Sequence, residues 1–326
     1  MGFMSGHLIN YYLKGIIEGD YGFIQIDALT WSFFHLPLCV ALTGASWGLL
    51  YFLFLGKSVE SKHKSFIDND IKLALSEQCD ELGKMKLHEK FVLVNYVALN
   101  IVLILGPNFI DQLSERSGFQ VTSSAVWVAF VVLLFVLPAN SMFQCHRKNR
   151  LLTWKVLNET MPWHLLFLAS TCVVLSKLFR TSGLQQLVRD NFHEYDLPNP
   201  LYVQILISIV TAVVCEFCQN AVVVAIFAPY AAHMADVMHV HPLYFVLAVY
   251  HAGTLSIMWP GSCICNEVVF AEAQCKITDM AVPGLIIKVI GGIISILAIN
   301  SMGFVVFGMV ITPYRLPHEE DVTDQF

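Results

Sequence analysis

Hydrophobic positions along this chain gather into long runs, and polar or charged positions fall mainly between the runs. The runs that we take as separate elements are 29–55, 91–106, 121–137, 162–178, 201–232, 242–259 and 282–311. Most of them approach the length of about 20 apolar residues that a helix needs to cross a bilayer. We therefore predict an all-α integral membrane protein that crosses the membrane several times.

The composition supports the same class of protein. Hydrophobic residues make up 56% of the 326 residues and charged residues only 13%, whereas soluble domains carry about 25% charged residues. The net charge of −6 gives no indication of a nucleic-acid partner. The sequence contains no phosphate-binding glycine loop, nucleophile elbow or zinc-binding helix motif, so we expect neither an enzyme nor a bound cofactor.

Lysine and arginine residues predict how the chain is oriented in the membrane. Seven lysines lie in the segment 57–90, which we interpret as a solvated cytoplasmic linker, and a second basic cluster lies at 147–155. Because the loop between them holds only Arg116, both basic loops are expected on the cytoplasmic side. The N-terminal segment 1–28, which lacks the features of a cleavable signal peptide, and the acidic tail 312–326 are then expected outside.

Two of the hydrophobic runs are interrupted by polar residues. The letters CEFCQN at 215–220 divide the first into apolar halves of about fourteen and twelve residues, each too short to span a bilayer alone. We therefore predict a re-entrant hairpin over 201–233. The letters PGSCICNE at 260–267 interrupt the second run, which predicts a broken helix over 242–270.

Paired helix interruptions at membrane depth are typical of transporter binding sites. Their free carbonyl groups can coordinate Na⁺, and the N-termini of the half-helices can bind an anion. We predict a substrate and sodium site formed by Cys218, Gln219, Asn220, Ala221, Pro260, Ser262, Cys263 and Asn266, with Na⁺ near Asn220 and Asn266. The carboxylates Glu216 and Glu267 accompany the two interruptions, although each interruption could also be a simple loop between short spans.

The stretch CEFCQNAVVVAIFAPYAAHMADVMHVHPLYF resembles the second hairpin of the divalent anion:sodium symporter family, the solute carriers of dicarboxylates and citrate. Glu216, Phe217, Asn220 and the later HPLY at 241–244 match the family pattern of T-E-F-T-S-N-T followed by H-P-L-Y. The second interruption is similar to the family's M-L-P-V-A-T-P-P-N-A-I-V-F, with matches at Met258, Pro260, Asn266, Val269 and Phe270. The resemblance extends from about Trp31 to Gly303.

This resemblance implies a sodium-coupled symporter of di- or tricarboxylates such as succinate or citrate, acting as a homodimer in the plasma membrane. Departures from the family pattern include Cys218, Gln219 and Ala221 at the first interruption. At the second interruption they include Cys263 and Cys265. The resemblance also implies a truncated inverted-repeat architecture. The span 29–56 then ends the first repeat, and 91–311 forms the second repeat, with scaffold helices over 91–160.

Two other functions are compatible with these residues. The first is a non-transporting membrane subunit or pseudo-transporter of the same family. It is suggested because the hairpin of the family's first repeat has no counterpart in 1–29. The second is a thiol-based metal site in which Cys215 and Cys218 face Cys263 and Cys265, with His239 and His251 nearby. Against this second reading, the nine cysteines lie mostly in apolar runs, where thiols act as small apolar side chains.

Overall fold

The computed structural model describes residues 2–20, 26–55, 64–104, 123–138, 150–161, 199–273 and 276–309, together with scattered helical positions between 163 and 182. Its described elements are helices, and an isolated β-bridge joins Pro138 to Arg150. The all-α prediction is thus confirmed. The chain forms two compact units: the first comprises 1–26, 30–50 and 164–326, and the second comprises 27–29 and 51–163.

The second unit contains helices α3 (Lys64–Leu82), α4 (Leu87–Ile104), α6 (Ser123–Val136) and α7 (Trp154–Thr160). Helix α4 packs against α6, and the Asn95 side chain donates a hydrogen bond to the Phe130 carbonyl at 3.4 Å. Helix α3 exposes its side chains wherever they are described, as its mixed charges predict. Most of the predicted element 162–178 lies outside the described residues.

The first unit begins with a short helical turn, η1 (Met4–Gly6), and helix α1 (Leu8–Asp20). Ile9, Leu13, Ile16 and Ile17 recur at helical spacing and are buried, and α1 packs against helix α11 (Asn220–Val237). We predicted no helix in this segment, because charged and polar residues separate its apolar positions. The N-terminal segment is therefore part of the core of the first unit.

Helix α2 (Ala28–Leu50) and the π-helical turn η2 (Tyr51–Leu55) form the first long apolar element. An aromatic cluster joins α2 to helix α12 (Pro242–Thr254): Trp31 stacks on His35 at 3.9 Å, and both rings meet Tyr250 edge-on. The Tyr250 hydroxyl donates to the Asn10 side chain at 2.7 Å, which ties α1 to the same cluster. These contacts hold α1, α2 and α12 together around the buried hydrogen bond between Tyr250 and Asn10.

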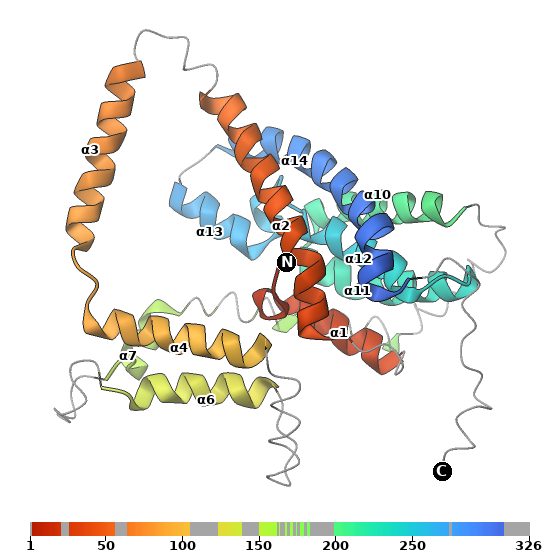
Figure 1. Cartoon of the computed structure of the whole chain (residues 1–326), viewed down its shortest axis with the longest axis horizontal. Coiled ribbons are helices and arrows are strands. Elements are labelled where there is room, and N and C mark those ends of the chain that lie inside the picture. The colour runs from red at the N-terminus through yellow and green to blue at the C-terminus, as the bar shows by residue number, and fades with distance from the viewer. Residues whose placement is uncertain are drawn as a thin grey trace. The chain divides into compact units, whose positions relative to one another are not determined.

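Helix α10 (Pro200–Phe217) precedes α11, and α12 packs against both of them (Figure 1). Helices α10 and α12 each begin with a proline, which suits a first helical turn because proline lacks an N–H to satisfy. The preceding residues provide the caps: the Asn199 side chain accepts from Leu201 N–H, and the His241 ring accepts from Leu243 N–H. Residues 242–253 of α12 are all buried, so α12 is the central helix of this unit.

After α12 the chain passes through the short 3₁₀ turn η3 (Pro260–Ser262) into α13 (Ile264–Ala273). A long apolar element follows, formed by α14 (Ile277–Ala298), the π-helical turn η4 (Ile299–Gly303) and α15 (Phe304–Phe307). Helix α12 contacts both α14 and η4.

Four apolar helical segments in the described part are long enough to cross a membrane: Ala28–Phe54, Pro200–Phe217, Asn220–Val237 and Ile277–Phe307. The two arms of the predicted hairpin, α10 and α11, have 18 residues each. Each is therefore about 27 Å long, close to the thickness of the hydrocarbon core. Our expectation that each arm is too short to span was wrong, because both helices continue through polar residues that end the apolar runs.

Candidate functional site

The first interruption is a two-residue break between α10 and α11. Cys218 is extended (φ −122°, ψ 157°), and its N–H donates to the Val214 carbonyl at 3.0 Å, which closes the last turn of α10. Gln219 is also non-helical, and Asn220 begins the next helix. The polar cluster at 215–220 thus ends one helix and starts another, and the non-helical backbone is limited to Cys218 and Gln219.

The N-terminus of α11 leaves polar groups available at this break. The Gln219 side chain forms no capping hydrogen bond. The Gln219 backbone carbonyl accepts from Val222 N–H at 3.0 Å and from Val223 N–H at 3.2 Å. Asn220 is only 3% exposed and, as the first residue of α11, directly follows Gln219, whose side chain provides no cap. A buried amide at an uncapped helix N-terminus is a suitable partner for a carboxylate.

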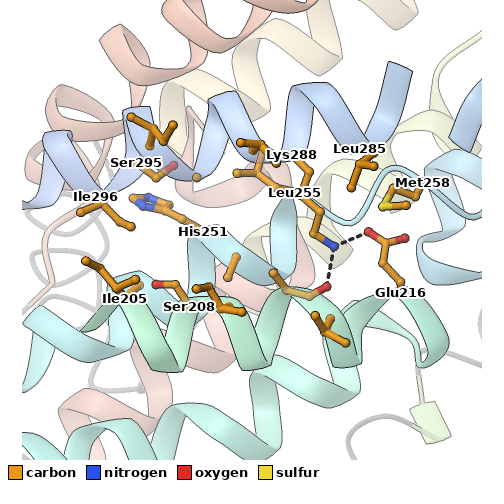
Figure 2. Close-up of a pocket in the computed structure, with 18 of the residues that line it drawn as sticks. Ile205, Ser208, Glu216, His251, Leu255, Met258, Leu285, Lys288, Ser295 and Ile296 are labelled. Carbon is orange, nitrogen blue, oxygen red and sulfur yellow. Dashed lines mark hydrogen bonds and ion pairs between the residues drawn. The ribbon is translucent and has the colours of Figure 1, made fainter. Parts of the chain in front are cut away.

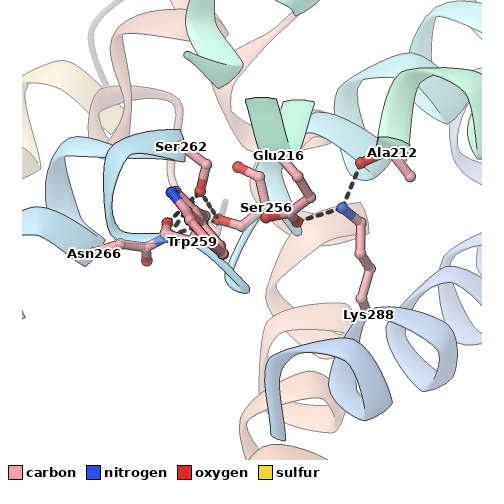
Figure 3. A network of polar contacts seen from close by, with 7 residues as sticks. All are labelled: Ala212, Glu216, Ser256, Trp259, Ser262, Asn266 and Lys288. Atoms are coloured by element: carbon pink, nitrogen blue, oxygen red, sulfur yellow. Dashed lines mark hydrogen bonds and ion pairs between the residues drawn. The ribbon is translucent and has the colours of Figure 1, made fainter. Parts of the chain in front are cut away.

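The second interruption runs from Leu255 to Cys263, and Asn266 organises it from the first turn of α13 (Figure 3). The Asn266 amide nitrogen lies 2.8 Å from the Ser256 carbonyl, 3.2 Å from the Trp259 carbonyl and 3.2 Å from Ser262 Oγ. From the sequence, we placed the second interruption at 260–267, so that the irregular backbone included Asn266. It ends three residues earlier, because Cys263 O accepts the N–H groups of Asn266 and Glu267 and starts the helix.

The remaining predicted site residues lie on this same irregular stretch. Pro260 begins η3, Ser262 is buried and donates to the Trp259 carbonyl at 2.7 Å, and Cys263 follows η3 in an extended conformation. The structure thus brings Ser262 and Asn266 together, and η3 contacts α10. That Asn220 and Asn266 face one shared pocket stays a prediction.

A cavity of about 580 Å³ lies between α10, α12 and α14 (Figure 2). Its walls are mainly apolar, with side chains such as Ile205, Leu255 and Ile293. Polar groups are few: Glu216 and Lys288 form an ion pair at one end, and His251, Ser208 and Ser295 contribute the others. The hydrophobic pattern does not predict this cavity, because its walls come from three separate helices.

Two polar links join α10 to the element formed by α14 and η4. In the first, the Lys288 ammonium donates to the Glu216 carboxylate and to the Ala212 carbonyl. In the second, Asn300 in η4 donates to the Gln204 side chain at 2.8 Å and accepts from the Tyr244 hydroxyl at 2.8 Å.

The two links have the same spacing on both elements. Positions 204 and 216 are twelve residues apart, as are 288 and 300, and their order is reversed between the two elements. The element formed by α14 and η4 therefore runs antiparallel to α10 along the cavity. Lys288 was not among the predicted site residues, although it is the single ionisable residue of the run 282–311.

The thiol-site hypothesis finds no geometric support. Cys215 is buried, Cys263 is half-buried, and Cys218 and Cys265 are exposed. Among the described residues there is no group of three or more His, Cys, Asp or Glu side chains placed to hold a metal ion. The four cysteines of the hypothetical metal site are thus free thiols in this structure.

Comparison with known proteins places these features in a family. Residues 1–309 match the family model described as the sodium:sulfate symporter transmembrane region. The human solute carrier family 13 member 4 is 26% identical over 91% of this chain, and the mouse Na⁺/dicarboxylate cotransporter 3 is 28% identical over 95%. The mouse Na⁺/citrate cotransporter is 25% identical over 87%.

The chain spans about half the length of these curated relatives: 50%, 55% and 54% of them, respectively. The family match nevertheless covers nearly the whole chain, including both helix interruptions and the long apolar element that follows them. The chain is therefore a multi-pass membrane protein that belongs to the sodium:sulfate symporter transmembrane family.

Proposed function

We propose that this chain takes part in sodium-coupled transport of di- or tricarboxylates, such as succinate or citrate, across the plasma membrane. Two of its relatives are named as Na⁺/dicarboxylate and Na⁺/citrate cotransporters, which supports this substrate class. The observation that carries the proposal is the position of Asn220, which is buried at the start of α11, where the Gln219 side chain provides no cap.

The substrate carboxylate would bind at the start of α11. There the N–H groups of Asn220 and Ala221 precede the first N–H that bonds within the helix, and the positive end of the helix dipole favours an anion. The neighbouring Gln219 side chain does not cap these groups. A carboxylate of the substrate could thus provide the missing cap while it accepts from the Asn220 amide.

The coupling Na⁺ would bind near the carbonyl groups of the two interruptions. At the second interruption, the Ser256 and Trp259 carbonyls already accept from Asn266 and Ser262, which fixes their orientation. Each of these oxygens already accepts from both side chains, so a bound Na⁺ would take the place of one of these hydrogen bonds. Sodium would then offset the charge of the incoming anion, which is the physical basis of coupled transport.

We also propose that the transporter is a homodimer. Helix α10 exposes apolar side chains at Tyr202, Leu206, Ile209 and Val213, a stripe suited to contact with lipid or with a second copy of the chain. The molar mass of the detergent-solubilised protein, measured by light scattering, tests this. A mass of one chain at all concentrations contradicts the dimer.

Uptake of radiolabelled succinate and citrate into cells that express the full chain tests the transport function. We expect uptake that is lost when Na⁺ is replaced by choline. Asn220→Ala and Asn266→Ala should each weaken the apparent substrate or sodium affinity by roughly ten- to hundredfold, because a hydrogen bond to a charged group contributes about 1.5–3 kcal/mol.

Asn158→Ala is the matched control, because Asn158 is exposed on α7 in the other unit, and it should transport like the wild type. Uptake that persists in choline contradicts sodium coupling. Correct surface expression without any uptake favours instead a non-transporting subunit of the same family.

A further inference from the structure

The ion pair between Glu216 and Lys288 lies within two apolar helices, where isolated charges are costly. Both side chains are largely buried, with exposed fractions of 11% and 10%. Glu216 lies in the last turn of α10, and Lys288 lies near the middle of α14. Ionisable groups in such surroundings are paired with each other and are rarely there for stability alone.

The oxygens around the Lys288 ammonium resemble the surroundings of a bound metal cation. The ammonium contacts the Glu216 carboxylate and the Ala212 carbonyl, four residues earlier on the same face of α10 (Figure 3). The second carboxylate oxygen of Glu216, Oε2, is buried and has no partner among the described residues. Two oxygens therefore contact the ammonium and a third belongs to the same carboxylate, and all three lie in the C-terminal part of α10, where the helix dipole adds negative potential.

We propose that these oxygens form a monovalent-cation site, which the Lys288 ammonium fills as a covalently attached cation. Na⁺ and K⁺ prefer carboxylate and carbonyl oxygens, and helix C-terminal ends contribute to such sites in transporters. Because the ammonium is part of the chain, this cation cannot leave. The site is separate from the sodium site proposed at the interruptions and does not depend on that proposal.

The variant Lys288→Met tests this inference, because methionine keeps much of the length of the side chain and removes its charge. In choline chloride, the unpaired Glu216 should lower the melting temperature of the detergent-solubilised protein by roughly 5–10 °C. Titration with NaCl or KCl at constant ionic strength should recover most of this loss and saturate. The wild type should show no such additional recovery.

The double variant Glu216→Gln/Lys288→Met keeps both interruptions intact but lacks the carboxylate. It should melt above Lys288→Met in choline and should not show the additional response to Na⁺ or K⁺. Lys276→Met is the control for loss of a lysine, because Lys276 is exposed directly before α14, and this variant should behave like the wild type.

Either of two outcomes overturns the inference. In the first, Lys288→Met is equally unstable or aggregated in choline, Na⁺ and K⁺, so that no cation replaces the ammonium. In the second, the double variant responds to cations as strongly as Lys288→Met, which places the effect elsewhere. Aggregation in choline that is prevented by Na⁺ or K⁺ supports the site even if the variant cannot be melted in choline. The response of the wild type to Na⁺ reports separately on the proposed transport site.

Discussion

At the scale of single residues, close backbone approach explains why glycine occupies position 284 of α14. A Cβ atom there would lie 2.8 Å from the Ile257 carbonyl oxygen and 3.0 Å from Met258 Cα. Both are backbone atoms of the second interruption and cannot move aside by a change of rotamer. Gly292, on the same helix, has nothing within 4 Å of the equivalent position. The first glycine thus sets how closely α14 packs against the irregular stretch.

We therefore expect Gly284→Ala to lower the free energy of unfolding by about 1–3 kcal/mol, the usual cost of overpacking. Gly292→Ala should be neutral or slightly stabilising, because alanine favours a helix more than glycine does. Thermal unfolding of both variants in detergent checks this. Equal melting temperatures for the two variants would show that α14 does not pack against Ile257 as described.

At the scale of elements, the π-helical turn η4 allows Asn300 to join three segments. The Asn300 amide donates to the Ile296 carbonyl within its own element and to Gln204 on α10, and it accepts from Tyr244 on α12. Single-turn π-helical insertions occur frequently at functional positions. Here the turn lies where a polar side chain must reach two neighbouring helices through apolar surroundings.

Tyr244→Phe should lower the free energy of unfolding by about 1–3 kcal/mol, because it leaves the oxygen of a largely buried amide without its donor. Tyr202→Phe on exposed α10 surface is the matched change and should stay within about 0.5 kcal/mol of the wild type. Differential scanning fluorimetry of the purified proteins measures both. If both variants melt like the wild type, the amide is not held by Tyr244.

The elements differ in how well the sequence predicted them. Both helix interruptions were predicted, because polar letters inside an apolar run have few structural explanations. The exact limits were not, since CEF at 215–217 continues α10 and CNE at 265–267 already belongs to α13. Helix α1 was missed because Lys14 and Glu18 mask its apolar stripe. The ion pair was missed because its partners are 72 residues apart and only folding brings them together.

At the scale of the whole molecule, the distribution of basic residues predicts which side of the membrane each loop faces. The linker 57–90 is expected in the cytoplasm, and α3 within it carries Cys79, an exposed free cysteine. Because Cys79 is accessible in the folded chain, its chemical labelling reports on the orientation of the protein.

A membrane-impermeant maleimide should therefore label Cys79 in permeabilised cells and not in intact cells. Mass spectrometry of the peptide that contains Cys79 gives the labelled fraction without the need to replace the other cysteines. Cys79→Ser serves as the control for assignment of the labelled peptide. Strong labelling in intact cells would reverse the predicted orientation.

The equal spacing of the two polar links has a mechanical consequence for the first unit. If α10 slid along α14 by even one helical turn, about 5.4 Å, both links would lose their partners at the same time. Charged and amide groups would then lie in an apolar environment without hydrogen-bonding partners. The free energy of such intermediate positions is therefore high. We therefore expect α10 and the element formed by α14 and η4 to move together as one rigid body.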